Sequence, residues 1–220
     1  MTRVHFEDIV IKESHDPLVN IKEYPFLTEP SYFNQGFSQQ STIWLRRSVA
    51  NKLLEIQASF NGKYRFKIWD GYRPREVQDA IYNSFWKKLA NEYPGWVDNQ
   101  LHHAVEQFVT KATTQERIPP HSTGGAVDLT LVDEVGDELD MGTVFDHFGD
   151  AARPLYYEEN NIDENVCNNR RILRTAMLRK EFTPDDDEWW HYDFGDQLWA
   201  LRSKRESAIF GEATPPSIFG

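Results

Sequence analysis

EWWHYDF, residues 188–194, sets an acid and an imidazole among aromatic side chains. A buried strand would account for the aromatic residues, because they are enriched in strands. It would not account for Glu188 and His191, since buried polar groups are costly unless they are paired or bound to a metal. We therefore interpret this stretch as the last strand of a sheet, with tryptophans that pack and shield the site and an edge that carries chemistry.

The rest of the chain predicts helices around a few strands. Helices are predicted over residues 46–60, from Pro74 to about Tyr93, over residues 97–111 and over residues 163–180. Strand-like alternation occurs over residues 64–69 and 126–133. These strands are too few and too unevenly spaced for a doubly wound parallel sheet. We predict an α+β fold, with a small, mainly antiparallel sheet and flanking helices.

Composition narrows the class of protein. The 220 residues suit one domain over the whole chain, 1–220, with an irregular segment at 1–42 and a loosely held tail at 206–220. A net charge of -11 without a basic stripe argues against nucleic acid and anionic membranes as partners. The N-terminus lacks the pattern of a secretory signal, so we expect a cytoplasmic protein. The oligomeric state is left open, with a homodimer as one option.

Cysteine usage restricts any metal site. Cys167 is the single cysteine, which excludes an internal disulfide and a cysteine-based zinc cluster. A metal would have to be held by histidine and carboxylate. The pair His102-His103 falls in a predicted helix of polar character, and we interpret it as a solvent-exposed face.

The stretch HSTGGAVD, residues 121–128, supplies a histidine and a carboxylate close together. Asp128 lies between apolar residues of a predicted strand, and two glycines allow the chain to fold His121 back toward it. With His191 they form a set of two imidazoles and one carboxylate. That set is typical of catalytic zinc, which polarises a carbonyl and lowers the pKa of its bound water.

Glu188 has the chemistry of a general base and acid for such a site. Residues three apart on a regular strand face opposite sides, so Glu188 and His191 can share a site in two ways. Either residues 189–190 contain a bulge, or Glu188 lies in the turn before the strand.

The stretch DGYRP, residues 70–74, places an arginine in a rigid turn at the end of a predicted strand. The permanently charged guanidinium of Arg73 is suited to stabilise the oxyanion of a tetrahedral intermediate, and Asp70 could orient it. Each of these motifs alone is common in proteins without such a site. Together they supply two imidazoles, a carboxylate ligand, a base and an electrophile in one short chain.

These motifs resemble those of the D-alanyl-D-alanine dipeptidases, zinc peptidases that share a fold with the hedgehog signalling domain. The family pattern S-x-H-x-x-G-x-A-x-D, then E-x-x-H, with W-D-G-Y-R-P upstream, reads here as PPHSTGGAVD, EWWH and IWDGYRP. The resemblance covers roughly residues 64–194. It implies one Zn²⁺ per chain, held by His121, Asp128 and His191, with Glu188 as base and acid and Arg73 as stabiliser of the transition state.

The resemblance also implies how a short D,D-peptide would be held. It assigns Asp146, in MGTVFD, and Tyr24 to substrate binding. The serine of the family pattern is replaced by Pro119, which offers neither a hydroxyl nor a backbone N–H. We expect hydrolysis of D-Ala-D-Ala or a closely related short D,D-peptide, with one contact to the substrate lost.

Four alternatives remain open from the sequence. A D,D-carboxypeptidase acting on longer peptidoglycan stems would use the same zinc site in a more open cleft. A non-haem iron oxygenase also uses two histidines and a carboxylate, but usually with the first histidine and the carboxylate two residues apart. A non-catalytic zinc-binding module would not need Glu188 and Arg73. A globular protein without any metal is the plainest alternative.

Overall fold

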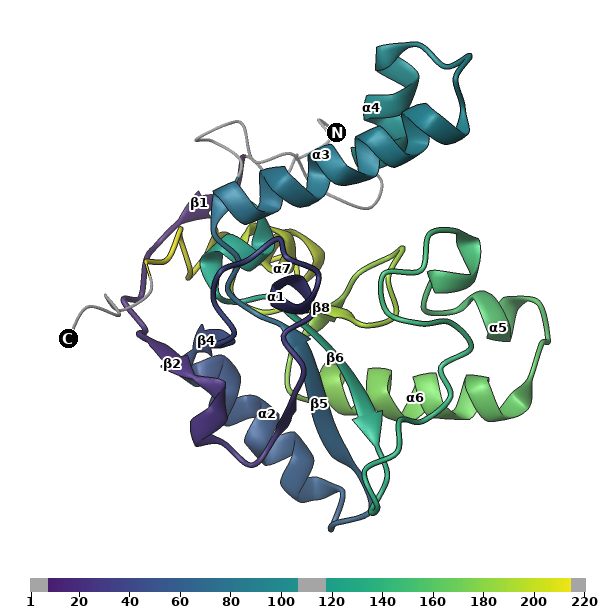
Figure 1. Cartoon of the computed structure of the whole chain (residues 1–220). Coiled ribbons are helices and arrows are strands. Elements are labelled where there is room, and N and C mark those ends of the chain that lie inside the picture. Colours follow the sequence, from purple (N-terminus) through teal and green to yellow (C-terminus); the bar gives the residue numbers. More distant parts are fainter. Residues whose placement is uncertain (1–7, 107–117, 215–220) are drawn as a thin grey trace.

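The structure is a computed structural model that describes residues 8–106 and 118–214, and its centre is a five-stranded sheet (Figure 1). Its order is β3-β5-β6-β8-β7; β3 runs parallel to β5, and the other three pairs are antiparallel. The strands are β3 (Leu27–Thr28), β5 (Arg65–Asp70), β6 (Val127–Val132), β7 (Thr183–Pro184) and β8 (His191–Asp193). The predicted α+β class with a mainly antiparallel sheet is confirmed.

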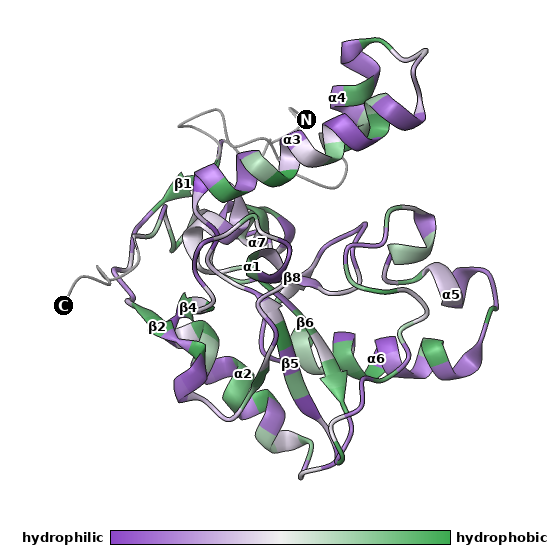
Figure 2. Cartoon of the chain, in the orientation of Figure 1, coloured by the Kyte–Doolittle hydropathy of each residue, from purple (hydrophilic) through white to green (hydrophobic). Residues whose placement is uncertain are grey.

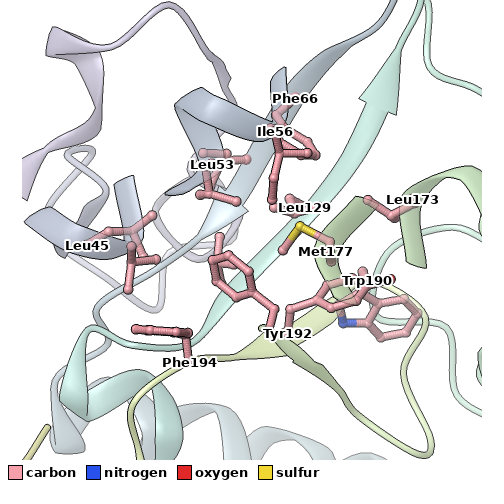
Figure 3. Close-up of a cluster of buried hydrophobic side chains, with 14 of the residues drawn as sticks. Leu45, Leu53, Ile56, Phe66, Leu129, Leu173, Met177, Trp190, Tyr192 and Phe194 are labelled. Atoms are coloured by element: carbon pink, nitrogen blue, oxygen red, sulfur yellow. The ribbon is translucent and has the colours of Figure 1, made fainter. Parts of the chain in front are cut away.

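Two long helices build the core with the sheet. These are α2 (Arg47–Ser59) and α6 (Glu164–Arg179), which the sequence predicts almost to the residue. Side chains of both helices gather with residues of β6 and β8 in one buried cluster (Figure 3). Each helix alternates apolar and polar bands along its length (Figure 2), as expected for a helix with one buried face. Side chains of β6 alternate as well, so Leu129 faces this core while Asp128 faces the other side.

A helical arm extends from the sheet (Figure 1). It consists of α3 (Arg75–Glu92) and α4 (Asp98–Glu106), which share a second cluster of buried apolar residues. The helix predicted over residues 97–111 matches α4, and residues 107–111 lie outside the described residues. None of the helices that the structure describes is both long and apolar enough to cross a membrane.

The described part of the N-terminal segment is less irregular than predicted. Strand β2 (Leu18–Asn20) pairs with β4 (Trp44–Arg46), β3 joins the main sheet, and α1 (Ser31–Asn34) follows it. Elements of two to four residues are too short to show periodicity in the sequence. The short strands among them are defined by pairing with strands more than 20 residues away in the sequence.

The prediction of a loosely held tail is wrong for the part of the tail that the structure describes. Strand β9 (Ser207–Ala208) pairs with β1 (Val10–Ile11), and Phe210 is buried beneath the guanidinium of Arg46, 4.9 Å from its ring centre. These contacts hold the segment because they bury its apolar side chains. Residues 215–220 lie outside the described residues.

The last strand is shorter than EWWHYDF suggests. Only His191–Asp193 forms β8, and residues 188–190 belong to the turn before it. The turn is closed by the backbone N–H of His191, which donates to the carbonyl of Glu188 at 3.4 Å. Two further short helices, α5 (Tyr156–Glu159) and α7 (Gln197–Arg202), complete the fold.

Candidate active site

Three neighbouring strands present polar side chains side by side. Asp128 on β6 pairs with His191 on β8 on one side and with Asp70 on β5 on the other. The register of β5 shifts between Ile68 and Asp70. Such a bulge re-aims the side chains that follow it, and here it brings Asp70 opposite Asp128.

His121 reaches the same place from a short 3₁₀ helix, Pro120–Thr123, that precedes β6. The helix ends at Gly124 with φ 70°, a conformation that favours glycine. At Gly125 a Cβ atom would lie 2.3 Å from the carbonyl oxygen of Phe194, so only glycine allows this close approach to the residue that follows β8. The two glycines therefore fold His121 back toward Asp128, as the sequence predicts.

The three side chains form a buried cluster that fits a metal ion. Their ligand atoms all lie within 4.8 Å of one another. His121 Nδ1 donates to the carbonyl of Gly71 at 2.7 Å, and His191 Nε2 donates to Asp193 at 2.7 Å. The other two ring nitrogens, His121 Nε2 and His191 Nδ1, face each other at 3.1 Å. In neutral rings both would carry lone pairs, which repel at that distance unless a cation or a proton lies between them.

The charges in this cluster are strongly perturbed. Burial alone would raise the pKa of Asp128, but the charges and hydrogen bonds of His121 and His191 hold it well below its ordinary value. Burial opposes the charged form of His191, yet Asp193 and Asp128 raise its pKa well above the ordinary value. Without a metal, the pocket therefore attracts positive charge to the position between the imidazoles.

Glu188 stands beside the cluster in the turn before β8. Its Oε2 lies 4.0 Å from His191 Nδ1. Of the two geometries that the sequence allows, the structure has the turn and not a bulge. Burial and the charge of Asp185 raise the pKa of Glu188 well above its ordinary value. The side chain is thus close enough to exchange a proton with a molecule held at the cluster.

Arg73 lies on the other flank, held by three side chains. Its Nε donates to Asp70 at 2.8 Å, Nη1 to Gln78 at 2.8 Å, and Nη2 approaches Asp128 at 3.4 Å. The contact with Asp70 is the one that the sequence predicts. Burial would lower the pKa of Arg73, but the acidic groups around it raise it above the ordinary value, so the guanidinium is permanently charged.

A tyrosine that the sequence reasoning missed covers the site. Tyr32 in α1 lies over Arg73, 4.4 Å from the guanidinium carbon to the ring centre, and its hydroxyl donates to Asp146 at 3.2 Å. Burial and the charge of Asp128 raise the pKa of Asp146 to about 7. Tyr24 instead donates to Asn51 of α2 and stacks on Phe26. The structure therefore joins Asp146 to Tyr32 and does not bring Tyr24 to it.

Comparisons with known proteins show to which family the chain is similar. A family model described as D-ala-D-ala dipeptidase matches residues 26–208. A D-alanyl-D-alanine dipeptidase of Synechocystis is 30% identical over 87% of this chain and 87% of its own. One of Enterococcus faecium is 29% identical over 61% of this chain and 64% of its own. The structure of VanYB in complex with D-alanine-D-alanine aligns with a TM-score of 0.44 at 17% identity, over 76% of this chain and 83% of that one. The family match and the Synechocystis relative establish that the chain belongs to the D-ala-D-ala dipeptidase family of metallopeptidases.

Proposed function

We propose that this protein is a zinc-dependent hydrolase of D-Ala-D-Ala or a closely related short D,D-peptide. The observation that carries the proposal is the buried cluster His121–Asp128–His191, with Glu188 on one flank and Arg73 on the other. Two imidazoles and one carboxylate are a donor set that zinc accepts in hydrolytic sites. When bound, zinc supplies Lewis-acid chemistry, which polarises the peptide carbonyl and makes water more acidic.

The side chains around the cluster supply proton transfer and stabilisation of the oxyanion. Glu188 takes the proton of the attacking water and then delivers it to the departing amine. Its raised pKa suits the second step, and a divalent cation nearby would favour the ionised form needed for the first. Arg73 meets the negative charge that develops on the carbonyl oxygen, and Asp70 keeps the guanidinium in place.

The amino end of the substrate is assigned to Asp146 and Tyr32. A partly buried carboxylate next to a phenol hydroxyl offers a charge and a hydrogen-bond acceptor to an ammonium group. We transfer the role first assigned to Tyr24 to Tyr32, because Tyr32 is the tyrosine bonded to Asp146. Pro119, which stands where the family pattern has a serine, is buried and has no side-chain hydrogen bond to offer, so we expect one contact to the substrate fewer.

The proposal is tested by the release of free D-alanine from D-Ala-D-Ala. We expect release by zinc-loaded protein, loss of release on chelation, and recovery when zinc is returned. L-Ala-L-Ala serves as the matched control peptide and should not be cleaved. Protein that binds one zinc ion per chain and releases no D-alanine would refute the dipeptide as substrate.

Pro119 favours one second candidate, a D,D-carboxypeptidase acting on longer peptidoglycan stem peptides. A site with fewer contacts to a free amino end depends less on that end being present. One assay distinguishes the two activities, namely D-alanine release from the dipeptide and from a pentapeptide stem that ends in D-Ala-D-Ala. If the protein is a carboxypeptidase, it should release D-alanine faster from the pentapeptide. The cytoplasmic location expected from the sequence stays a prediction, and it fits the dipeptide better than the stem.

A further inference from the structure

The Nε2 nitrogen of His191 is held by an ion pair between a buried aspartate and a partly exposed arginine, and none of the roles above uses this pair. Asp193 is completely buried, and its Oδ1 accepts from His191 Nε2 at 2.7 Å. Its Oδ2 accepts from Nη1 of Arg202, the last residue of α7, at 2.8 Å. Both oxygens are therefore occupied, which is how a fully buried carboxylate can remain charged.

We propose that Asp193, fixed by Arg202, is a positioning residue that presents Nδ1 of His191 to the metal. A neutral imidazole carries a single N–H, and a strong acceptor at Nε2 holds that proton there. Nδ1 then has its lone pair directed at the cluster, where it lies 3.1 Å from Asp128 Oδ1. This inference rests on the proposed zinc site and extends it to residues that touch neither metal nor peptide.

The chemistry requires an aspartate and not merely a polar side chain. The position must accept two hydrogen bonds from opposite sides, one from His191 and one from Arg202. An asparagine has one oxygen for these two donors. Arg202 is permanently charged and so takes the oxygen, which leaves the amide NH₂ facing Nε2. That arrangement favours the proton on Nδ1, and a protonated Nδ1 cannot bind a metal.

The first test is Asp193→Asn, measured by zinc affinity in competition with a chromophoric chelator. We expect affinity to fall about 10- to 100-fold, the usual range for removing an acceptor behind a metal-bound histidine. In ¹⁵N NMR of the metal-free protein, at a pH high enough for the His191 ring to be neutral, the ring proton should move from Nε2 to Nδ1. Glu181→Gln is the control: it breaks an exposed pair with Arg205 just beyond α7, and zinc affinity should not change.

The second test is the double variant Asp193→Asn/Arg202→Met. Without Arg202, the asparagine oxygen is free to accept from Nε2, so zinc affinity should recover toward the wild-type value relative to Asp193→Asn alone. If Asp193 only stabilises the fold, the double variant should bind zinc more weakly than Asp193→Asn, because two changes at one ion pair disturb the fold more than one. Weaker zinc binding by the double variant than by Asp193→Asn would overturn the proposal.

A measurement on the unaltered protein covers the case in which the variants do not fold. In zinc-loaded wild-type protein, ¹⁵N shifts should show His191 bound through Nδ1 and protonated on Nε2. Binding through Nε2 would overturn the inference. These readouts need no peptide, so zinc-loaded protein that releases no D-alanine would refute the proposed substrate and leave the role of Asp193 to be decided by the NMR result.

Discussion

At the scale of single residues, Glu188 is the residue whose substitution should best separate an effect on catalysis from an effect on zinc binding. It flanks the cluster at 4.0 Å from a ligand nitrogen and supplies no atom to the three-ligand set. Glu188→Gln should therefore keep zinc and reduce kcat about 100- to 10,000-fold, the range expected for a lost general base. Zinc content by equilibrium dialysis and D-alanine release together check this. If the variant loses the metal, Glu188 is a ligand and its assignment as base is wrong.

Asp146 gives a pH-dependent prediction for the metal-free protein. Its pKa is raised from 3.8 to about 7 by burial, so between these values the folded protein holds a proton that the unfolded chain lacks. The stability from this proton is fully present below pH 4 and is lost as the pH rises through 7. Asp146→Asn should thus gain stability relative to wild type between pH 4 and pH 8, by a few kcal/mol at most.

Urea unfolding of both proteins at pH 5 and pH 8, with chelator present, measures this difference. Asn tolerates the backbone conformation of Asp146, whose φ is 57°, so the substitution adds little strain. A difference between the two proteins that is the same at both pH values would show that Asp146 is already ionised at pH 5.

The residues of the cluster could be predicted from the sequence, whereas the tyrosine could not. The three residues of the cluster lie in short motifs that can be recognised locally. Asp128 and His191 stand among apolar or aromatic neighbours, and two glycines follow His121 closely. The link from Tyr32 to Asp146 spans 114 residues and depends on where α1 rests over Arg73. No local pattern distinguishes Tyr32 from Tyr24, since both lie in the proline-rich N-terminal segment.

At the scale of elements, the turn between β5 and α3 carries both Arg73 and the acceptor for His121. Gly71 makes this possible, because a Cβ there would lie 2.5 Å from the carbonyl oxygen of Trp44. Gly71→Ala should destabilise the protein by about 1–3 kcal/mol through overpacking. It should also weaken zinc binding, because the Gly71 carbonyl that fixes His121 must move.

Gly95→Ala is the matched control, since a Cβ at that position meets nothing within 4 Å. Thermal unfolding and zinc titration of both variants give the comparison. Equal stability and equal zinc affinity in the two variants would show that the turn accommodates the added methyl group without moving His121.

The long elements were predictable and the short ones were not, for a physical reason. Helices α2 and α6 each have several turns over which apolar spacing repeats. Strands β3 and β7 have two residues each and exist because longer strands offer them an edge. The last strand is shorter than predicted for a related reason. The aromatic residues 189–190 are typical of a strand, but in the structure they belong to a turn whose side chains are buried.

At the scale of the whole molecule, one buried arginine connects the site to segments near both ends of the described chain. Arg46 donates to the carbonyl of Thr123, in the helix that carries His121, and to the carbonyl of Gly211. It also pairs with Glu13, which accepts from the backbone N–H of Gly211. The sequence could not predict this tie, because it joins segments up to 198 residues apart.

Because the cluster joins the 3₁₀ helix and β6 to β8, which lies far from them in the sequence, metal binding should stabilise the entire fold. Zinc that binds only the folded state adds about 4 kcal/mol at a concentration 1,000 times its Kd. For a chain of this size that corresponds to a rise in Tm of roughly 8–16 °C. His121→Ala removes one ligand and should abolish most of this rise, whereas His103→Ala, at an exposed position on α4, should leave it unchanged. An equal zinc-induced rise in wild type and His121→Ala, followed by differential scanning calorimetry, would mean that zinc stabilises the protein from another site.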